Sequence, residues 1–217
     1  WQADLGSTET VKAAPVIVDV DDDGKPEILV VYDAAGTLFI DAWSPRLSCS
    51  VTGWSSGGHS GELLWTWSDE GLMISSNEGP YTNSLLGGHK PTTQPLLADL
   101  DLDGDAELVI AAIDDSDDDK FPVVLAFPLQ ANGTPSPLWE VTLDKGSHPS
   151  DPAFAQVDDS TGYVLLTTIE ASNGVMWAWK IDSSSGDSSW DGGLLLDNTD
   201  GDTNSPHVRL PGPVIAN

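Results

Sequence analysis

The chain repeats one pattern of residues along its length, and this repetition constrains its fold more than any other feature. Residues 14–32 (APVIVDVDDDGKPEILVVY) align without gaps with residues 94–112 (QPLLADLDLDGDAELVIAA), and residues 151–169 (DPAFAQVDDSTGYVLLTTI) keep the same frame. Residues 212–217 (GPVIAN) begin a fourth copy. A fixed internal period is typical of proteins in which each repeat is one small unit that buries its apolar faces against its neighbours.

Each copy contains four short apolar runs, separated by Gly, Pro, Asn and Asp. Two runs lie in the aligned segment, a third ends in an aromatic residue, and a fourth follows. The third runs are 37–43, 122–127 and 174–181, and the fourth runs are 61–67, 136–143 and 190–196. β-Branched and aromatic residues fill the runs, and helical periodicity is hard to find. The sequence therefore predicts an all-β fold of tandem four-stranded antiparallel blades, propeller-like in arrangement.

We expect a single repeat domain over residues 1–217, with modules at about 14–91, 92–149 and 150–210. Residues 1–6 resemble the fourth strand of a preceding module, and residues 212–217 resemble the first strand of a following one. Three blades plus two end fragments are too few for an ordinary closed ring. Three alternatives follow: the ends close a small ring within the molecule, each end pairs with another chain, or the sequence is a piece of a longer protein.

The charge balance excludes two classes of partner. The chain has 35 Asp and Glu against 8 Lys and Arg, a formal net charge of -27. Nucleic acids and anionic membranes would be repelled, whereas cations, a calcium-rich medium or a basic partner are favoured. An acidic surface kept for solubility is the alternative interpretation. No apolar run of about 18 residues is present, so direct membrane insertion is not expected.

The segment between the first two runs of each clear repeat carries the candidate metal ligands. In a tight loop, carboxylates at alternate positions converge on one centre, and a glycine allows the sharp reversal of the chain. The first loop offers the side chains of Asp19, Asp21, Asp23 and Glu27, the carbonyl of Lys25, and Gly24 at the reversal. The second loop offers the side chains of Asp99, Asp101, Asp103 and Glu107, the carbonyl of Asp105, and Gly104 at the reversal.

Hard oxygen ligands in this number suit Ca²⁺, which takes six to eight oxygens at about 2.3–2.6 Å, so we predict two calcium sites. An EF-hand is disfavoured because its bidentate glutamate position holds Val30 or Ile110 here and both flanks are strand-like. Mg²⁺ is less suitable because so many protein oxygens would crowd its octahedral shell. The alternative is a pair of turns capped by their own side chains.

Two other segments are weaker candidates. The third copy has Gln156, Asp158 and Ser160 where the carboxylates stood, so we expect a turn without a metal. Residues 197–204 (DNTDGDTN) are rich in oxygen ligands but lack a following strand.

The two loops, VDVDDDGKPEILVVY and ADLDLDGDAELVIAA, resemble the FG-GAP/VCBS repeats of integrin-type propellers and of many secreted microbial proteins. The resemblance implies calcium bound between the first two strands of a blade, and a location outside the cell. The chain departs from the family in using Glu27 and Glu107 where Asp is usual, and in showing too few blades for the usual seven.

Other residues recur without a defined role. His89, His148 and His207 stand 59 residues apart, which favours a repeated packing or capping role over a ring of metal ligands. Trp65 and Trp67 alternate, as do Trp177 and Trp179, so each pair shares one face of a strand. Packing between blades is the expected use, and a sugar-stacking platform is the alternative.

No nucleophile motif, zinc motif or phosphate loop is present, so we do not expect an enzyme. The sequence predicts a secreted, calcium-binding, structural or adhesive protein that self-associates into a surface assembly or fibre by strand complementation between chains. A module that binds a glycan or a protein is the alternative function, and a polysaccharide-active enzyme is the third.

Overall fold

The computed structural model describes residues 10–11, 13–44, 61–74, 93–114, 120–130, 133–170, 175–188 and 193–197 of the chain. These residues form β-strands and turns and contain no helix, which confirms the predicted all-β class. In the described part of the chain there is accordingly no helix that could cross a membrane. The expected end fragments, residues 1–6 and 212–217, lie outside the described residues.

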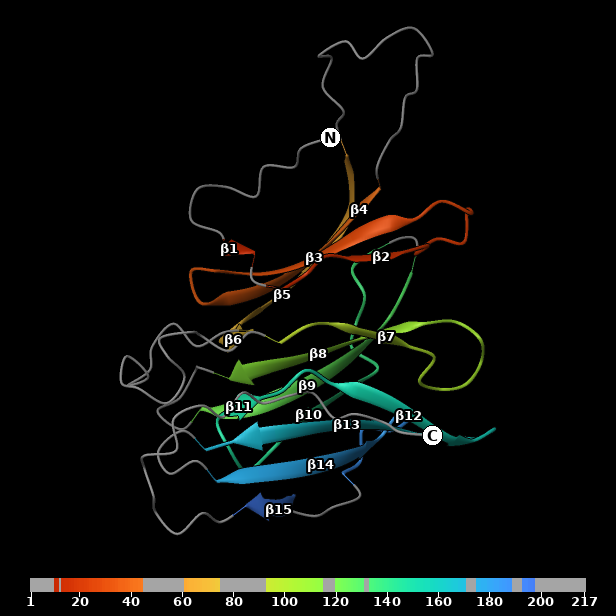
Figure 1. The fold of residues 1–217 in the computed structure, drawn as a ribbon. Coiled ribbons are helices and arrows are strands. Elements are labelled where there is room, and N and C mark those ends of the chain that lie inside the picture. Colours follow the sequence, from red (N-terminus) through yellow and green to blue (C-terminus); the bar gives the residue numbers. More distant parts are fainter. Residues whose placement is uncertain are drawn as a thin grey trace, which may run out of the picture.

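The strands form three antiparallel sheets that follow one another in chain order (Figure 1). The first sheet contains β1 (Thr10–Val11), β2 (Val16–Val18), β3 (Glu27–Ala34), β4 (Thr37–Ser44) and β5 (Glu62–Glu70). The second contains β6 (Leu72–Met73), β7 (Leu96–Ala98), β8 (Glu107–Asp114), β9 (Phe121–Pro128) and β10 (Trp139–Thr142). The third contains β11 (His148–Pro149), β12 (Ala153–Asp158), β13 (Thr161–Ile169), β14 (Met176–Asp182) and β15 (Leu194–Asp197).

All three sheets share one topology. In each, two short strands pair with different ends of the same long strand, and two further strands extend the sheet by antiparallel pairing. The first sheet thus has four positions in the order β1/β2, β3, β4, β5, and the others repeat it. The sheets and the expected modules are offset, because β6 lies within 14–91 but joins the second sheet, and β11 lies within 92–149 but joins the third. Each sheet is open, and the described strands close no ring.

Two apolar cores lie between successive sheets. One core joins the first sheet to the second, and Trp65 and Trp67 both belong to it. The other joins the second sheet to the third, with Trp139 and Trp179 buried in it and Trp177 packed against it. The tryptophan pairs therefore pack between successive sheets, as the sequence predicts for its repeated units. The middle sheet is buried on both faces, and nearly every residue of β8 and β9 is buried.

Tryptophan hydrogen bonds tie neighbouring sheets at equivalent places. The indole N–H of Trp65 in β5 donates to the carbonyl of Gln130, which follows β9 of the next sheet, at 3.0 Å. The indole N–H of Trp139 in β10 donates to the carbonyl of Ser183, which follows β14, at 2.8 Å. Each bond satisfies a buried donor and fixes the position of one sheet on the next.

A second set of bonds runs along the residues that precede the repeated prolines. The side chain of Gln94 accepts a hydrogen bond from the backbone N–H of Ala14 at 2.7 Å. The side chain of Asp151 accepts one from the backbone N–H of Gln94, also at 2.7 Å. The segment that precedes β2 is thus linked to the segment that precedes β7, and that segment is linked to the one that precedes β12.

His148 is a packing residue of β11. Its side chain is buried, and its Nδ1 lies 3.0 Å from Ser147 Oγ. Burial, with a smaller contribution from the charge of Lys120, lowers the pKa of His148 to about 4, so the ring is neutral near pH 7. His89 and His207 lie outside the described residues.

Replacing Trp139 with Phe should reveal the value of the inter-sheet hydrogen bond. The phenyl ring retains apolar contact but leaves the Ser183 carbonyl without the indole N–H, so we expect a loss of about 1–3 kcal/mol in the free energy of unfolding. Trp177→Phe is the matched control, because Trp177 Nε1 has no hydrogen-bond partner among the described residues. Urea unfolding should show a much smaller loss for the control, and equal losses would contradict the assigned role.

Candidate metal centres

The loop between β2 and β3 is held in shape by its own aspartates. Asp19 Oδ1 accepts a hydrogen bond from the N–H of Asp23 at 3.2 Å, and Asp19 Oδ2 accepts one from the N–H of Gly24 at 2.8 Å. Asp21 Oδ1 also accepts from the N–H of Asp23, at 3.2 Å. The chain reverses through positive φ angles at Asp22 (59°) and Gly24 (81°), and the latter explains the glycine.

The loop between β7 and β8 has the same construction. Asp99 accepts hydrogen bonds from the N–H groups of Asp103 and Gly104, both at 3.0 Å, and Asp101 accepts a longer bond from Asp103. Positive φ angles recur at Leu102 (63°) and Gly104 (104°). Two segments 80 residues apart in the sequence therefore adopt one backbone conformation, as their alignment predicts.

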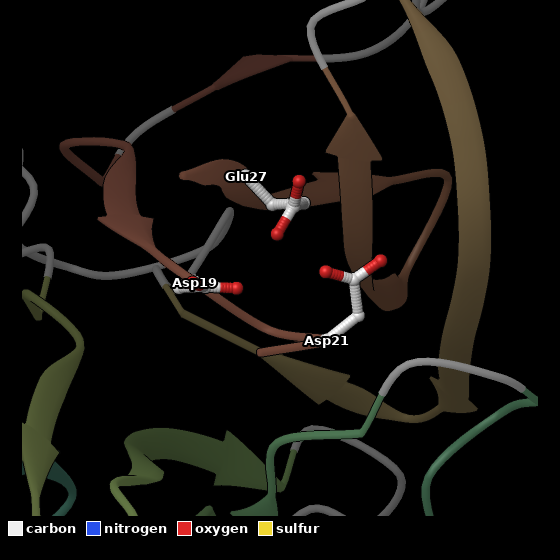
Figure 2. Close-up of side chains that lie close together, drawn as sticks. All are labelled: Asp19, Asp21 and Glu27. Carbon is white, nitrogen blue, oxygen red and sulfur yellow. The ribbon is translucent and has the colours of Figure 1, made fainter. Parts of the chain in front are cut away.

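Three carboxylates converge in each loop. Asp19, Asp21 and Glu27 each offer an oxygen, and these oxygens lie within 4.8 Å of one another; Asp99, Asp101 and Glu107 do the same. Figure 2 shows the carboxylates of the first group turned toward a common space between the loop and the start of β3. The two aspartates come from the loop, and the glutamate comes from the first residue of the following strand.

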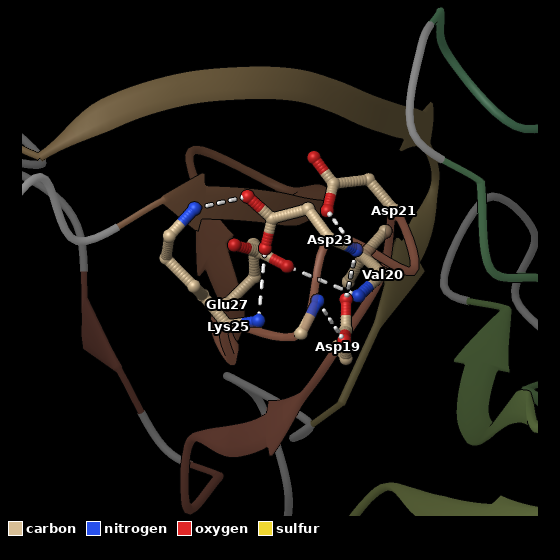
Figure 3. A network of polar contacts seen from close by, with 7 residues as sticks. Asp19, Val20, Asp21, Asp23, Lys25 and Glu27 are labelled. Carbon is tan, nitrogen blue, oxygen red and sulfur yellow. Dashed lines mark hydrogen bonds and ion pairs between the residues drawn. The ribbon is translucent and has the colours of Figure 1, made fainter.

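The glutamates are the buried members of these groups. Glu27 is 1% exposed and Glu107 is 5% exposed. Glu27 Oε2 accepts a hydrogen bond from the N–H of Val20 at 3.0 Å (Figure 3). Glu107 Oε2 accepts one from the N–H of Leu100 at 2.6 Å. Each glutamate thus binds the backbone of its loop and also contributes an oxygen to the convergent group.

Two of the predicted side-chain ligands are placed differently. Asp23 and Asp103 lie in the loops but outside the two convergent groups, and each accepts a hydrogen bond from the backbone N–H two residues later. Asp23 also pairs with the ammonium of Lys25, and this hydrogen bond lowers its pKa. The second loop has Asp105 in place of Lys25 and lacks that cation. Ligation through the carbonyls of Lys25 and Asp105 stays a prediction.

The second centre is electrostatically strained without a cation. Burial is the largest cause that raises the pKa of Glu107 to about 7; the charges of Asp101, Asp103 and Asp99 contribute to this rise, and the hydrogen bond from the N–H of Leu100 opposes it. A divalent cation in this space would remove the repulsion and favour the ionised carboxylate.

The chemistry of both centres is that of hard-cation binding. Each offers carboxylate oxygens without nitrogen or sulfur, so the residues fit Ca²⁺ or Mg²⁺ better than a softer transition metal. The two acidic groups can hold a metal ion at repeat-equivalent positions, as the sequence predicts.

The third loop has become a tight hairpin. Asp158 in β12 pairs directly with Thr161 in β13, and the carboxylate of Asp158 accepts hydrogen bonds from the N–H and Oγ of Ser160, both at 2.9 Å. The predicted turn is therefore present. Of the oxygen-rich segment 197–204, residues 198–204 lie outside the described residues.

Sequence analysis does not identify one set of acidic residues, because its members lie in two different sheets. Burial and the charges of Asp114 and Glu70 raise the pKa of Asp69 in β5. Burial and the charges of Asp69 and Asp114 raise the pKa of Glu140 in β10. No spacing along the chain indicates that these carboxylates influence one another's pKa.

Comparison with known proteins adds no relative: no protein-family profile, no curated protein and no solved structure matches the chain.

Calcium titration of site variants should separate the two centres. We expect two binding events in the unmodified protein and one in either Asp19→Asn or Asp99→Asn, because each change removes a ligand charge from one centre. Asp158→Asn, in the third loop, is the matched control and should retain both events. Isothermal titration calorimetry measures the stoichiometry; loss of both events in a single, still folded variant would contradict independent sites.

The pH dependence of stability should reveal the protonation of Glu107. In the metal-free protein its pKa is about 7 when folded against an ordinary 4.5, so the folded state binds more protons between these values. Glu107 contributes its full stabilisation of the folded state below about pH 4.5, and this contribution is lost as the pH rises through about 7. Melting temperatures measured in chelator should therefore fall over this interval, and they should fall less for Glu107→Gln.

Excess calcium should reverse the contribution of Glu107, since metal binding requires the deprotonated carboxylate and releases a proton. Stability from this centre should then rise with pH in the unmodified protein and not in Glu107→Gln. Parallel curves for the two proteins in both media would show that Glu107 does not control the centre.

Proposed function

We propose that the protein is a calcium-stabilised structural module of a propeller-like repeat assembly, which is secreted and serves in adhesion or in a surface fibre. One observation carries the proposal: the two acidic centres occur in equivalent loops, and each loop is built into the packing between sheets. A cation bound there would act on the whole stack and not on an isolated surface turn.

The coupling runs through the residue between the first two aspartates of each loop. Val20 is buried in the core between the first and second sheets, and Leu100 is buried in the core between the second and third. Their backbone N–H groups bind Glu27 and Glu107. The carbonyl of Leu100 also accepts a hydrogen bond from Ser183 Oγ of the third sheet. Drawing the carboxylates around an ion therefore fixes these apolar residues in their cores.

The choice of calcium follows from the number of oxygens and from the positions of the aspartates, of which Asp21 and Asp101 are exposed and Asp19 and Asp99 are half-buried. Ca²⁺ tolerates irregular coordination and carboxylates in mono- or bidentate modes, whereas Mg²⁺ keeps several waters and requires near-ideal octahedral geometry. Extracellular modules bind calcium with Kd of roughly 10⁻⁴–10⁻³ M, a range that matches a location outside the cell. The resemblance of the loops to FG-GAP/VCBS repeats supports the same ion and location.

An assembling role is supported by the open sheets. Among the described residues the three sheets are open, and repeat units of this kind are stabilised by packing on further units. Completion of strands between chains, through residues 1–6 and 212–217, is the form of assembly that the sequence favours; these residues lie outside the described part of the chain.

Removal of calcium should lower the melting temperature of the unmodified protein. Each site at ten times its Kd stabilises the native state by about 1.4 kcal/mol, so two sites supply about 2.8 kcal/mol. For a chain of this size the expected shift is roughly 5–10 °C. The double variant Asp19→Asn/Asp99→Asn should melt at one temperature with calcium or with chelator. A melt of the unmodified protein that chelator leaves unchanged would refute the proposal.

A further inference from the structure

The two metal centres differ in charge at the residue that follows the glycine of each loop. This residue is Lys25 in the first loop and Asp105 in the second. Each donates a backbone hydrogen bond to the aspartate two positions earlier, at 2.8 Å to Asp23 Oδ1 and at 2.9 Å to Asp103 Oδ1. The backbones therefore place the two side chains at equivalent positions, and one is a cation where the other is an anion.

The side chain of Lys25 turns back onto its own loop. Its ammonium donates a hydrogen bond to Asp23 Oδ2 and forms an ion pair with it (Figure 3). The hydrogen bond with Asp23 is the largest cause that raises the pKa of Lys25, and the charges of Asp23, Asp21 and Glu27 add to the rise. Asp21 and Glu27 belong to the convergent group. The positive charge of Lys25 therefore acts on the carboxylates that would bind a metal ion.

The second loop contains no basic residue. Residues 99–107 include five acids, which give a formal charge of -5. Residues 19–27 include five acids and Lys25, which give a formal charge of -4. The fifth acid of the first loop is Asp22, where the second loop has Leu102. The two loops thus differ by one unit of net charge, and only the first has a cation of its own.

Asp23 and Asp103 consequently have different electrostatic surroundings. Burial is the largest cause of the raised pKa of Glu107, and the charge of Asp103 contributes to it. A metal ion that enters the second centre would relieve this repulsion. Asp23 is instead held by the ammonium of Lys25, so a metal ion in the first centre would compete with that ammonium and be repelled by it.

We infer that Lys25 makes the two centres unequal: its ammonium serves the first loop as a resident counter-ion and weakens metal binding there, so that the second centre fills first. The inference rests on the calcium binding proposed above, and it adds the order of filling and the residue that sets this order. The affinity of a calcium site depends on the charge count of its ligands and on its rigidity. A charge within about 8 Å is only partly screened at physiological ionic strength, so Lys25 can act on the ion without touching it.

An order of filling gives the two inter-sheet cores different responses to calcium. Leu100, whose N–H binds Glu107, lies in the core between the second and third sheets, and its carbonyl accepts a hydrogen bond from Ser183 Oγ. Val20, whose N–H binds Glu27, lies in the core between the first and second sheets. A low concentration of calcium therefore stabilises the contact of the second sheet with the third, and a higher concentration stabilises the contact of the first sheet with the second.

The test first measures each centre alone. Asp99→Asn leaves the first centre intact and Asp19→Asn leaves the second, so calorimetric titration with calcium chloride gives one Kd for each. At low ionic strength we expect the first centre to bind about threefold more weakly, as a difference of one unit of charge near a divalent ion implies. In about 0.5 M salt the two Kd values should converge, because the exposed charge of Lys25 is then screened.

Variants at residue 25 and at its counterpart then identify the cause. Lys25→Gln in the Asp99→Asn protein should tighten the first centre about threefold at low ionic strength. Lys25→Arg should leave its Kd unchanged, because the charge is retained. Asp105→Lys in the Asp19→Asn protein changes the charge by two units and should weaken the second centre about tenfold.

Lys145→Gln is the matched control for the loss of one positive charge. Lys145 is also exposed and pairs with an aspartate, Asp144, but it lies outside both loops. In the Asp99→Asn protein this change should leave the Kd of the first centre nearly unaltered, so it separates an effect of Lys25 in its loop from an effect of the net charge of the protein.

Thermal melts provide a second measurement and verify that each variant is folded. In chelator, Lys25→Gln alone should lower the melting temperature, because the first loop loses its counter-ion, and calcium should then raise the melting temperature by more than it does in the unmodified protein. Asp105→Lys alone should have the opposite effects, because it gives the second loop a counter-ion.

Three results would overturn the inference while leaving calcium binding intact. These are equal affinities of the two centres at low ionic strength, a first centre that binds more tightly than the second, and equal effects of Lys25→Gln and Lys145→Gln on the first centre. An unmodified protein that binds no calcium would overturn the proposed function as well, so the two failures are distinguishable.

Discussion

The structure depends on covering both faces of each sheet. A single four-position sheet of this composition exposes apolar residues on either side, and only its neighbours remove them from water. The middle sheet shows the result, with β8 and β9 buried almost throughout between two cores. The tryptophan and pre-proline hydrogen bonds then fix the sheets relative to one another at equivalent positions. Stability is thus a property of the stack and not of one repeat.

In the acidic loops, charged side chains lie directly beside the apolar cores of the stack. A glutamate at the start of a long strand is buried, while its aspartate neighbours reach solvent, and the backbone of the loop joins the two environments. Burial makes an ionised glutamate unfavourable, as the raised pKa of Glu107 shows. A divalent cation bound there would offset this cost and would hold Val20 and Leu100 in their cores. The same arrangement would let the calcium concentration control how firmly the sheets hold together.

The sequence by itself determined the strand class, the order of the long strands and both acidic loops, because these are local: alternating carboxylates, a glycine at a positive φ and β-branched runs act within a few residues. It also identified the two glutamates. Only the tertiary structure decided that β6 joins the second sheet, that β11 joins the third, and that the charge of Asp69 raises the pKa of Glu140 in another sheet. These features arise from pairing and packing between segments far apart in the sequence, and the periodicity of one strand does not specify what lies beside it. The pairing of Asp23 with Lys25 is local to the loop, but the spacing of the carboxylates did not indicate it.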